Sequence, residues 1–348
     1  MLQIQKLGTS PAEEAWWSAY VQAHPGATIY HDLRWRRIFE SSFGYRSHYL
    51  LARLDDGRVV GALPLLEVKS PLSRRLVSVP FRDRGGPLWD TPEVFRGLLE
   101  EAVRLVSSLR ASCLELKSLD PLPDHPGLRE RRYWVHSVAD LSGVDPERLL
   151  ARLGAKTRNM LRQAERAGLA ASVQPPGEGL AEWYGVYLRS QRNLGLPPLP
   201  GAFFACVLHE LRDSARVLLV QQGLVPVAAC ILFRWRDIGM YAYSASLPEA
   251  RPLRPNDAML HRLVLWSLQT GLTRLDLGSD APSQESLLFF KRKWLARQST
   301  IPVYAWGKVD PAAADSSHPR YRLLRACFRK LPLPVLDYIG RVASRYFG

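Results

Sequence analysis

The feature of this sequence that most constrains its fold is an internal repeat. Residues 49–66 (YLLARLDDGRVVGALPLL) predict a strand, a tight Asp-Gly turn and a second strand, and residues 217–233 (VLLVQQGLVPVAACILF) follow the same plan with Gln-Gly at the turn. Later in each half come an amphipathic helix and a short strand, within 101–119 and within 261–279. Because hairpins dominate, the repeat predicts an α/β (α+β) fold in which each half holds a mixed, mostly antiparallel sheet flanked by helices.

The length of the chain fits this division. A chain of 348 residues is too long for one ordinary domain and accommodates two. The turn-rich stretch 120–130 separates the halves, and Asp145, followed by proline, predicts the N-cap of the first helix of the second half. We expect domains at 1–135 and 136–310, followed by a basic, amphipathic helical tail at 311–348.

Composition narrows the class of partner. The net charge of +14 favours an anionic one: nucleic acid, a phospholipid surface, a nucleotide-bearing cofactor or a phosphorylated substrate. No apolar run approaches the roughly 20 residues that cross a bilayer, and the N-terminal residues lack the pattern of a secretory signal. The cysteines are widely spaced, without a CxxC pair or a nearby histidine, which indicates buried or incidental thiols and no metal site. We expect a cytoplasmic protein.

Several enzyme classes find no support in the motifs. The sequence contains no GxSxG elbow, no HExxH and no Walker loop. Hydrolase, zinc protease and NTPase functions are therefore not indicated.

Two basic segments in the second half are candidates for anion binding. Residues 154–169 predict a helix stopped by Gly168, in which Arg158, Arg162 and Arg166 recur every fourth residue and share one face. Guanidiniums in such a row suit bidentate contacts to phosphate oxygens. The alternative is a face that is only solvated.

The second basic segment is residues 286–299, where three cations, Lys291 to Lys293, stand between Phe290 and Trp294. Flanking aromatic side chains fix the backbone while the cations reach outward, an arrangement that suits a phosphate or a carboxylate. Alternating aromatic and basic residues also suit nucleic acid. An ordinary edge strand shows the same pattern, so this alternative stays open.

The tail, residues 319–348, carries seven arginines and lysines against the single acid Asp337. Four of its apolar residues fall at helical spacing: Val335, Ile339, Val342 and Tyr346. A basic amphipathic helix of this kind lies on an anionic surface such as the inner face of the membrane. The alternative is a helix that docks its apolar stripe on the body of the protein and leaves its arginines in solvent.

Taken together, these segments resemble a known family. AKTRNMLRQAERAGL (155–169) resembles the Lys-x-Arg-Asn helix of the Fem-type aminoacyl transferases and their FemAB-like relatives, and FFKRKW (289–294) resembles their terminal Phe-Lys-x-x-Trp segment. Segments 31–45, 76–90 and 241–261 fall in the order expected of that family, so the resemblance covers nearly the whole chain. It implies two tandem GNAT-like acyltransferase domains, in agreement with the internal repeat.

The resemblance also implies an activity. Fem-type enzymes transfer an amino acid from aminoacyl-tRNA to an amine of a peptidoglycan precursor, and single GNAT domains transfer acyl groups from acyl-CoA. We expect an amide-forming transferase with aminoacyl-tRNA as the favoured donor and an amine on a small molecule or a lipid-linked, cell-envelope precursor as acceptor. No tightly bound cofactor is implied, only an activated co-substrate.

Two alternatives stay open. The first is an acyl-CoA-dependent N-acyltransferase, although the sequence shows no clear Arg/Gln-x-x-Gly-x-Gly/Ala loop of the kind that binds the CoA pyrophosphate. The second is a non-catalytic module that binds an anionic glycan precursor, a membrane or nucleic acid.

The family's functional residues carry over to a few positions. Lys291 matches the family lysine near the reacting acyl group and is the candidate catalytic residue. Arg158 matches a phosphate-contacting arginine, and Arg37, two residues after Trp35, matches a basic residue that contacts the diphosphate of the acceptor. The remaining candidate substrate contacts are Trp35, Asn159, Arg162, Phe290 and Trp294.

The chain departs from the family pattern in the same region. Gly278-Ser279-Asp280 and Glu285-Ser286 stand where Gly-Arg-Ser and Gly-Thr are common, and Leu295 follows Trp294 where the family often has glycine. Asp276 and His261 are candidates for a general base by their location alone. A base supplied by the substrate is the alternative.

Overall fold

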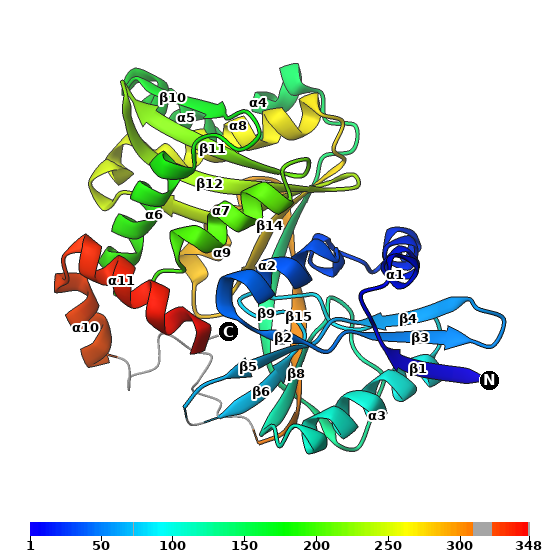
Figure 1. Cartoon of the computed structure of the whole chain (residues 1–348). Coiled ribbons are helices and arrows are strands. Elements are labelled where there is room, and N and C mark those ends of the chain that lie inside the picture. Colours follow the sequence, from blue (N-terminus) through cyan, green and yellow to red (C-terminus); the bar gives the residue numbers. More distant parts are fainter. Residues whose placement is uncertain (72, 309–321, 347–348) are drawn as a thin grey trace. The chain divides into compact units, whose positions relative to one another are not determined.

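The structure, a computed structural model, describes residues 1–71, 73–308 and 322–346, and at 131 and 132 it describes the backbone alone. It divides into two compact units (Figure 1). Unit 1 comprises Met1–Trp134, Thr300–Asp315 and Ala343–Gly348, and unit 2 comprises Val135–Ser299 and Ser316–Val342. Residues 311–321 and 347–348 of the expected tail lie outside the described residues.

The division differs from the expected domains on the carboxyl side. Strand β15 (Ala296–Gly307) was expected to belong wholly to the second domain, but from Thr300 onward its residues group with unit 1. The physical reason is hydrogen bonding, because Val303–Gly307 pair antiparallel with strand β8 (Cys113–Lys117). Strand β9 (Leu128–Asp140) likewise contributes residues to both units.

Unit 1 contains two sheets, with strand orders β1-β3-β4-β7 and β15-β8-β6-β5-β2. Its helices are α1 (Pro11–Ala23), α2 (Arg34–Phe43) and α3 (Pro92–Ser108). The strands not yet named are β1 (Leu2–Lys6), β2 (Arg46–Ser47), β3 (Leu50–Leu54), β4 (Val59–Leu63), β5 (Leu66–Lys69), β6 (Arg74–Val77) and β7 (Leu88–Trp89). The predicted hairpin is β3–β4, and Gly57 supplies the left-handed residue that its turn needs, with φ of +88°.

Helix α3 covers one face of the β3–β4 sheet and closes the core of unit 1. Its buried residues Val94, Leu98 and Ala102 recur at helical spacing and pack with the apolar strand residues. The approach is close, since a Cβ at Gly61 would lie 2.5 Å from Val94 Cγ1. This glycine therefore sets the distance between helix and sheet.

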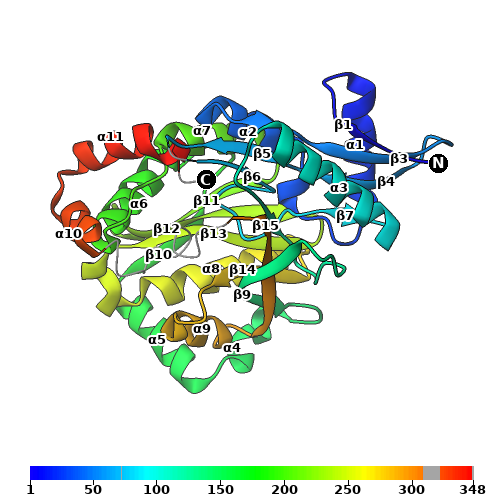
Figure 2. The same ribbon diagram turned by 90° about the horizontal axis from the view of Figure 1, so that it is seen from below.

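Unit 2 is built around strands in the order β10-β11-β12-β13-β14-β9. Helices α6 and α7 cover one face of its sheet and α5 and α8 the other (Figure 2). The helices are α4 (Leu149–Arg152), α5 (Ala155–Arg166), α6 (Leu180–Leu194), α7 (Gly201–Glu210), α8 (Pro255–Gln269), α9 (Glu285–Arg292), α10 (Arg322–Lys330) and α11 (Leu333–Ala343). The strands are β10 (Leu169–Val173), β11 (Ala215–Gln222), β12 (Val225–Trp235), β13 (Ile238–Ser246) and β14 (Arg274–Asp280), besides β9.

The repeat predicted from sequence is confirmed in both units. Each has its hairpin, β3–β4 or β11–β12, and each has one parallel pair, β6–β8 or β13–β14, whose strands are joined through a helix, α3 or α8. Eight further strand pairs among the described residues are antiparallel. The expected mixed, mostly antiparallel sheets flanked by helices are therefore present.

The second basic segment is not an edge strand. Glu285–Arg292 form helix α9, so Lys291 and Arg292 lie in its last turn, and the chain becomes extended only from Ala296 onward.

Candidate functional site

The parallel pairing of β13 with β14 is short. It joins Ile238 to Arg274, Gly239 to Leu275 and Met240 to Asp276, and among the described residues it is not continued beyond that point. On its other side β14 pairs with β9, with an irregularity between Asp276 and Ser279. Gly278 lies in this irregularity with φ of +77°, a conformation that a side chain would strain. The end of the parallel pairing and the bulge therefore coincide.

A histidine and an aspartate form a buried pair at this bulge. His136 Nε2, on β9, lies 3.0 Å from Asp276 Oδ1, on β14, and the side chains are 9% and 8% exposed. The backbone N–H of Gly278 also donates to Asp276 Oδ1, at 2.7 Å. Two donors on one carboxylate oxygen hold the aspartate, and the aspartate in turn orients the imidazole.

A second buried pair lies beside the first. Lys291 Nζ is 2.6 Å from Asp280 Oδ2, and the side chains are only 6% and 9% exposed. A Cβ placed at Gly278 would lie 3.9 Å from Lys291 Nζ, so the ammonium faces the bulge. We call His136, Asp276, Asp280 and Lys291 the Gly278 cluster. An ion pair removed from water in this way is costly to break, because the remaining charge is left uncompensated.

A different set of polar residues lies where α5, α8 and α9 meet. Lys293 Nζ is 3.5 Å from Asp257 Oδ1 and 3.4 Å from Met160 Sδ. Burial raises the pKa of Asp257 above its ordinary value, and Lys293 opposes that shift. Burial lowers the pKa of His261, whose ring centroid lies 6.4 Å from that of Trp294. His261 is therefore a histidine of α8 that packs against Trp294.

Of the arginine row on α5, one member has a local partner. Arg158 Nη1 donates to the carbonyl oxygens of Leu150 and Leu153, at the end of α4, and so caps that short helix. Asn159, Arg162 and Arg166 are exposed on α5. The exposed members of the row keep the geometry that suits an anion, whereas Arg158 is held by carbonyl groups.

Two of the expected substrate contacts are core residues. Trp35 is fully buried on α2, with its ring centroid 5.4 Å from that of Tyr30 and 5.5 Å from that of Phe39. Trp294 is 1% exposed and lies in the turn that follows α9. Both side chains pack in the core, and a contact of either with substrate stays a prediction.

Two of the other expected substrate contacts are accessible. Arg37 is exposed on α2 of unit 1, and Phe290 is half-buried in unit 2, with Lys293 Nζ 4.9 Å from its ring centroid. The structure brings Asp276 and Lys291 into one cluster and adds His136 and Asp280. The signal that would have found His136 is a lone imidazole among the alternating residues YWVHSVADL, at 133–141.

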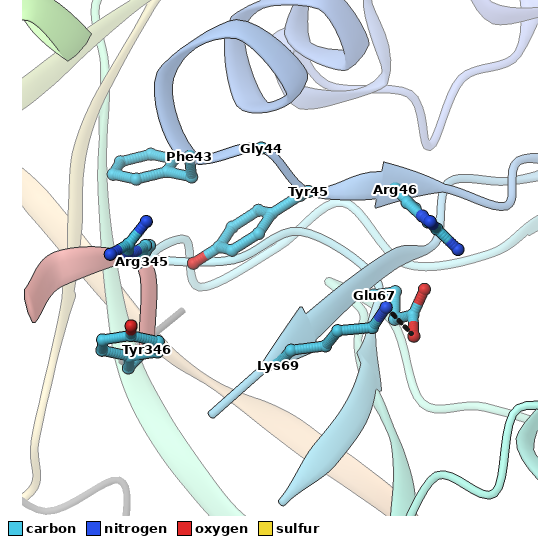
Figure 3. Close-up of a pocket in the computed structure, with 8 residues that line it drawn as sticks. All are labelled: Phe43, Gly44, Tyr45, Arg46, Glu67, Lys69, Arg345 and Tyr346. Atoms are coloured by element: carbon cyan, nitrogen blue, oxygen red, sulfur yellow. Dashed lines mark ion pairs between the residues drawn. The ribbon is translucent and has the colours of Figure 1, made fainter. Parts of the chain in front are cut away.

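Unit 1 contains a small pocket of about 230 Å³ (Figure 3). Aromatic and basic side chains line it: Phe43, Gly44, Tyr45, Arg46, Glu67, Lys69, Arg345 and Tyr346. Glu67 is buried and lies 3.3 Å from Lys69 Nζ and 3.2 Å from Arg74 Nε. Glu67 thus pairs with Lys69 at the pocket and with Arg74 beside it, and the pocket is smaller than most ligand pockets.

The described residues contain neither a metal-ligand cluster nor a membrane-spanning helix. Over the described ranges, no three His, Cys, Asp or Glu side chains gather closely enough to hold a metal ion. None of the described helices is both long and apolar enough to cross a membrane.

The chain is similar to known proteins in sequence around the Gly278 cluster and in fold over nearly its whole length. Residues 155–292 match the family model of an acetyltransferase (GNAT) domain, a span that includes Asp276, Asp280 and Lys291. The structure of FemX is similar over 92% of this chain and all of that chain, with a TM-score of 0.67 and 15% identity. No curated protein sequence matches the chain.

Two further structures show the same tandem arrangement of the fold. A tandem GNAT protein from the clavulanic acid biosynthesis pathway is similar over 89% of this chain and all of that chain, with a TM-score of 0.60 and 14% identity. L-PGS from Bacillus licheniformis is similar over 99% of this chain and 98% of that chain, with a TM-score of 0.54 and 14% identity.

The class follows from these findings. The chain shares the tandem GNAT fold of these structures, and residues 155–292 match the model of an acetyltransferase (GNAT) domain. Within this superfamily its overall fold is shared with FemX, as the sequence resemblance predicted.

Proposed function

We propose that this chain is an amide-forming acyl or aminoacyl transferase whose chemistry takes place at the Gly278 cluster. The observation that carries the proposal is the burial of two charge pairs, His136–Asp276 and Lys291–Asp280, where the β13–β14 pairing ends in a GNAT-fold domain. Burying four ionisable side chains together is costly for stability. Such clusters are typical of functional sites, where groups must be held ready to move protons or stabilise charge.

The geometry suggests a division of roles. A neutral His136 that donates from Nε2 to Asp276 has Nδ1 as its basic nitrogen, and we assign to it the proton of the attacking amine. Lys291 supplies positive charge for the oxyanion that forms at the acyl carbon. The amine forms the new C–N bond, the ester C–O or thioester C–S bond of the donor breaks, and the proton passes through His136 to the leaving group. Asp276 and Asp280 act as positioning residues.

The charge of the chain and the exposure of its arginines support one class of donor. With a net charge of +14 and with Arg162 and Arg166 exposed on α5, aminoacyl-tRNA remains the favoured donor, and Asn159, Arg162, Arg37 and Phe290 remain the proposed substrate contacts. The proposed acceptor is an amine on a small molecule or a lipid-linked peptidoglycan or cell-envelope precursor. The likeness to a tandem GNAT protein from the clavulanic acid pathway favours acyl-CoA as the second candidate donor.

The test is formation of a new amide. The purified chain is incubated with a charged tRNA pool or with acyl-CoAs, together with candidate amines, and the products are analysed by mass spectrometry. The double variant Lys291→Met/Asp280→Asn removes both charges at once, so that no lone charge stays buried, and we expect it to lose product formation. Arg58→Met/Asp56→Asn, which removes an exposed ion pair on the β3–β4 turn, is the matched control and is expected to keep it.

A second variant tests the proton acceptor. His136→Gln is expected to lower the rate about 100-fold or more. Absence of product with every donor would contradict the proposal. The proposal would also be contradicted if aminoacylated and free tRNA bound equally well and binding fell steeply with salt. Such binding indicates a nonspecific nucleic-acid module.

A further inference from the structure

Helix α11 has apolar side chains on two opposite faces. On one face Leu336 is fully buried, and a Cβ at Gly340 would lie 2.6 Å from the carbonyl oxygen of Pro198. On the other face Val335, Tyr338 and Val342 are 44%, 67% and 41% exposed. At 3.6 residues per turn these two sets point in opposite directions. Docking of α11 on unit 2 therefore accounts for the inner face only.

Helix α10 adds one exposed leucine. Phe328 is 9% exposed, whereas Leu323, which points away from it on the helix, is 82% exposed. We call Leu323, Val335, Tyr338 and Val342 the outer tail face. This set differs from the stripe expected from sequence, since Leu336 and Gly340 do the docking while Val335 and Val342 face solvent.

The charge around this face is one-sided. Described residues 322–346 contain six arginines and lysines and one acid, Asp337. Some of these cations have structural partners: Arg325 and Arg329 donate to the carbonyls of Leu194 and Asn193 at the end of α6, and Arg341 pairs with Asp337. Arg322 and Lys330 are exposed at the two ends of α10. The outer tail face is therefore apolar, and the segment that carries it is strongly cationic.

We propose that the outer tail face binds the surface of a bilayer that contains anionic phospholipid. Such a surface satisfies both properties, because aliphatic and aromatic side chains enter the headgroup boundary while arginine and lysine meet phosphates. A second copy of this chain would set like charges against each other. Nucleic acid would match the cations but leave the leucine and valines in water. The inference is independent of the proposed acyl transfer, since it uses no residue of the Gly278 cluster.

The test is co-sedimentation of the full chain with vesicles. We expect it to bind vesicles of phosphatidylcholine mixed with phosphatidylglycerol, to bind phosphatidylcholine vesicles much less, and to be released by salt. Val335→Ser/Tyr338→Ser is expected to lower the partition coefficient about tenfold. Leu224→Ser/Val225→Ser, at positions 93% and 57% exposed on the β11–β12 turn, is the matched control and should leave it unchanged.

A second pair of variants tests the charge. Arg322→Gln/Lys330→Gln is expected to weaken vesicle binding about fivefold for each cation removed. Arg189→Gln/Arg212→Gln has the same change in net charge at exposed sites outside the tail and should have a much smaller effect. All these positions are exposed, so the variants are expected to unfold at the temperature of the parent, which a thermal melt checks.

Three results would overturn the inference. The first is no binding to anionic vesicles. The second is equal loss of binding in the tail variants and their matched controls. The third is a dimer that Val335→Ser/Tyr338→Ser converts to a monomer without any change in vesicle binding, which would assign the face to a second copy of the chain.

Discussion

Leu295 follows helix α9 with φ of +64°, at a position where the resembling family often has glycine. The left-handed conformation costs a residue with a Cβ about 1–2 kcal/mol. The chain thus keeps the backbone that glycine would favour and accepts the strain of a leucine. Leucine in place of glycine at this position therefore adds local strain but leaves the turn between α9 and β15 in place.

This strain gives a prediction at one residue. Leu295→Gly is expected to be more stable than Leu295→Ala by about 1 kcal/mol, because only glycine adopts positive φ without strain. Urea unfolding of the two variants measures the difference. The same pair of substitutions at Leu287, inside α9, is the control, and there alanine should be the more stable. If alanine were the more stable substitution at position 295 as well, Leu295 would not be strained.

Among the elements, those marked by local signals were predicted best. The β3–β4 and β11–β12 hairpins and the end of α5 before Gly168 are confirmed. Asp145 is an N-cap as expected and accepts from the N–H of Glu147 at 2.9 Å, and a single 3-10 turn and the four residues of α4 follow. Leu153, in an extended conformation, ends α4.

The docking of α11 gives a prediction at the scale of an element. Gly340→Ala would place a Cβ 2.6 Å from the Pro198 carbonyl oxygen, so we expect α11 to be displaced. The hydrogen bond from the Tyr184 hydroxyl to Asp337 would be lost with it. Faster amide hydrogen exchange over 333–343 is the measurement. Gly185→Ala, on the open side of α6 with no atom within 4 Å, is the control and should stabilise the protein by about 0.5–1 kcal/mol. Unchanged exchange in Gly340→Ala would contradict the close packing.

For the whole molecule, buried histidines link stability to pH. Burial lowers the pKa of His48 in unit 1 and of His261 in unit 2 below the ordinary value of 6.5. Above that value both groups are neutral in the folded and unfolded chain. As the pH falls below it, the unfolded chain binds protons that the folded chain binds only at lower pH, so stability is lost with acidification.

The expected result is a free energy of unfolding that falls by at most about 1.4 kcal/mol per pH unit for each histidine below pH 6.5. His261→Gln should make this fall shallower, as measured by urea unfolding at several pH values. His209→Gln, at an exposed position on α7, is the control. An identical slope in the His261 variant and the parent would show that His261 does not contribute.

The sequence by itself determined the repeated plan of two mixed sheets and its likeness to the Fem-type chain, because turn chemistry and hydrophobic periodicity act over a few residues. It also indicated Lys291, which matches a family motif, and Asp276, which was a candidate by its location alone. The tertiary structure alone decided what these residues contact. His136 meets Asp276 and Lys291 meets Asp280 only because strand pairing and the packing of α9 bring them together. Burial likewise depends on packing, and so Trp35 and Trp294 became core residues while Val335 and Val342 remained exposed.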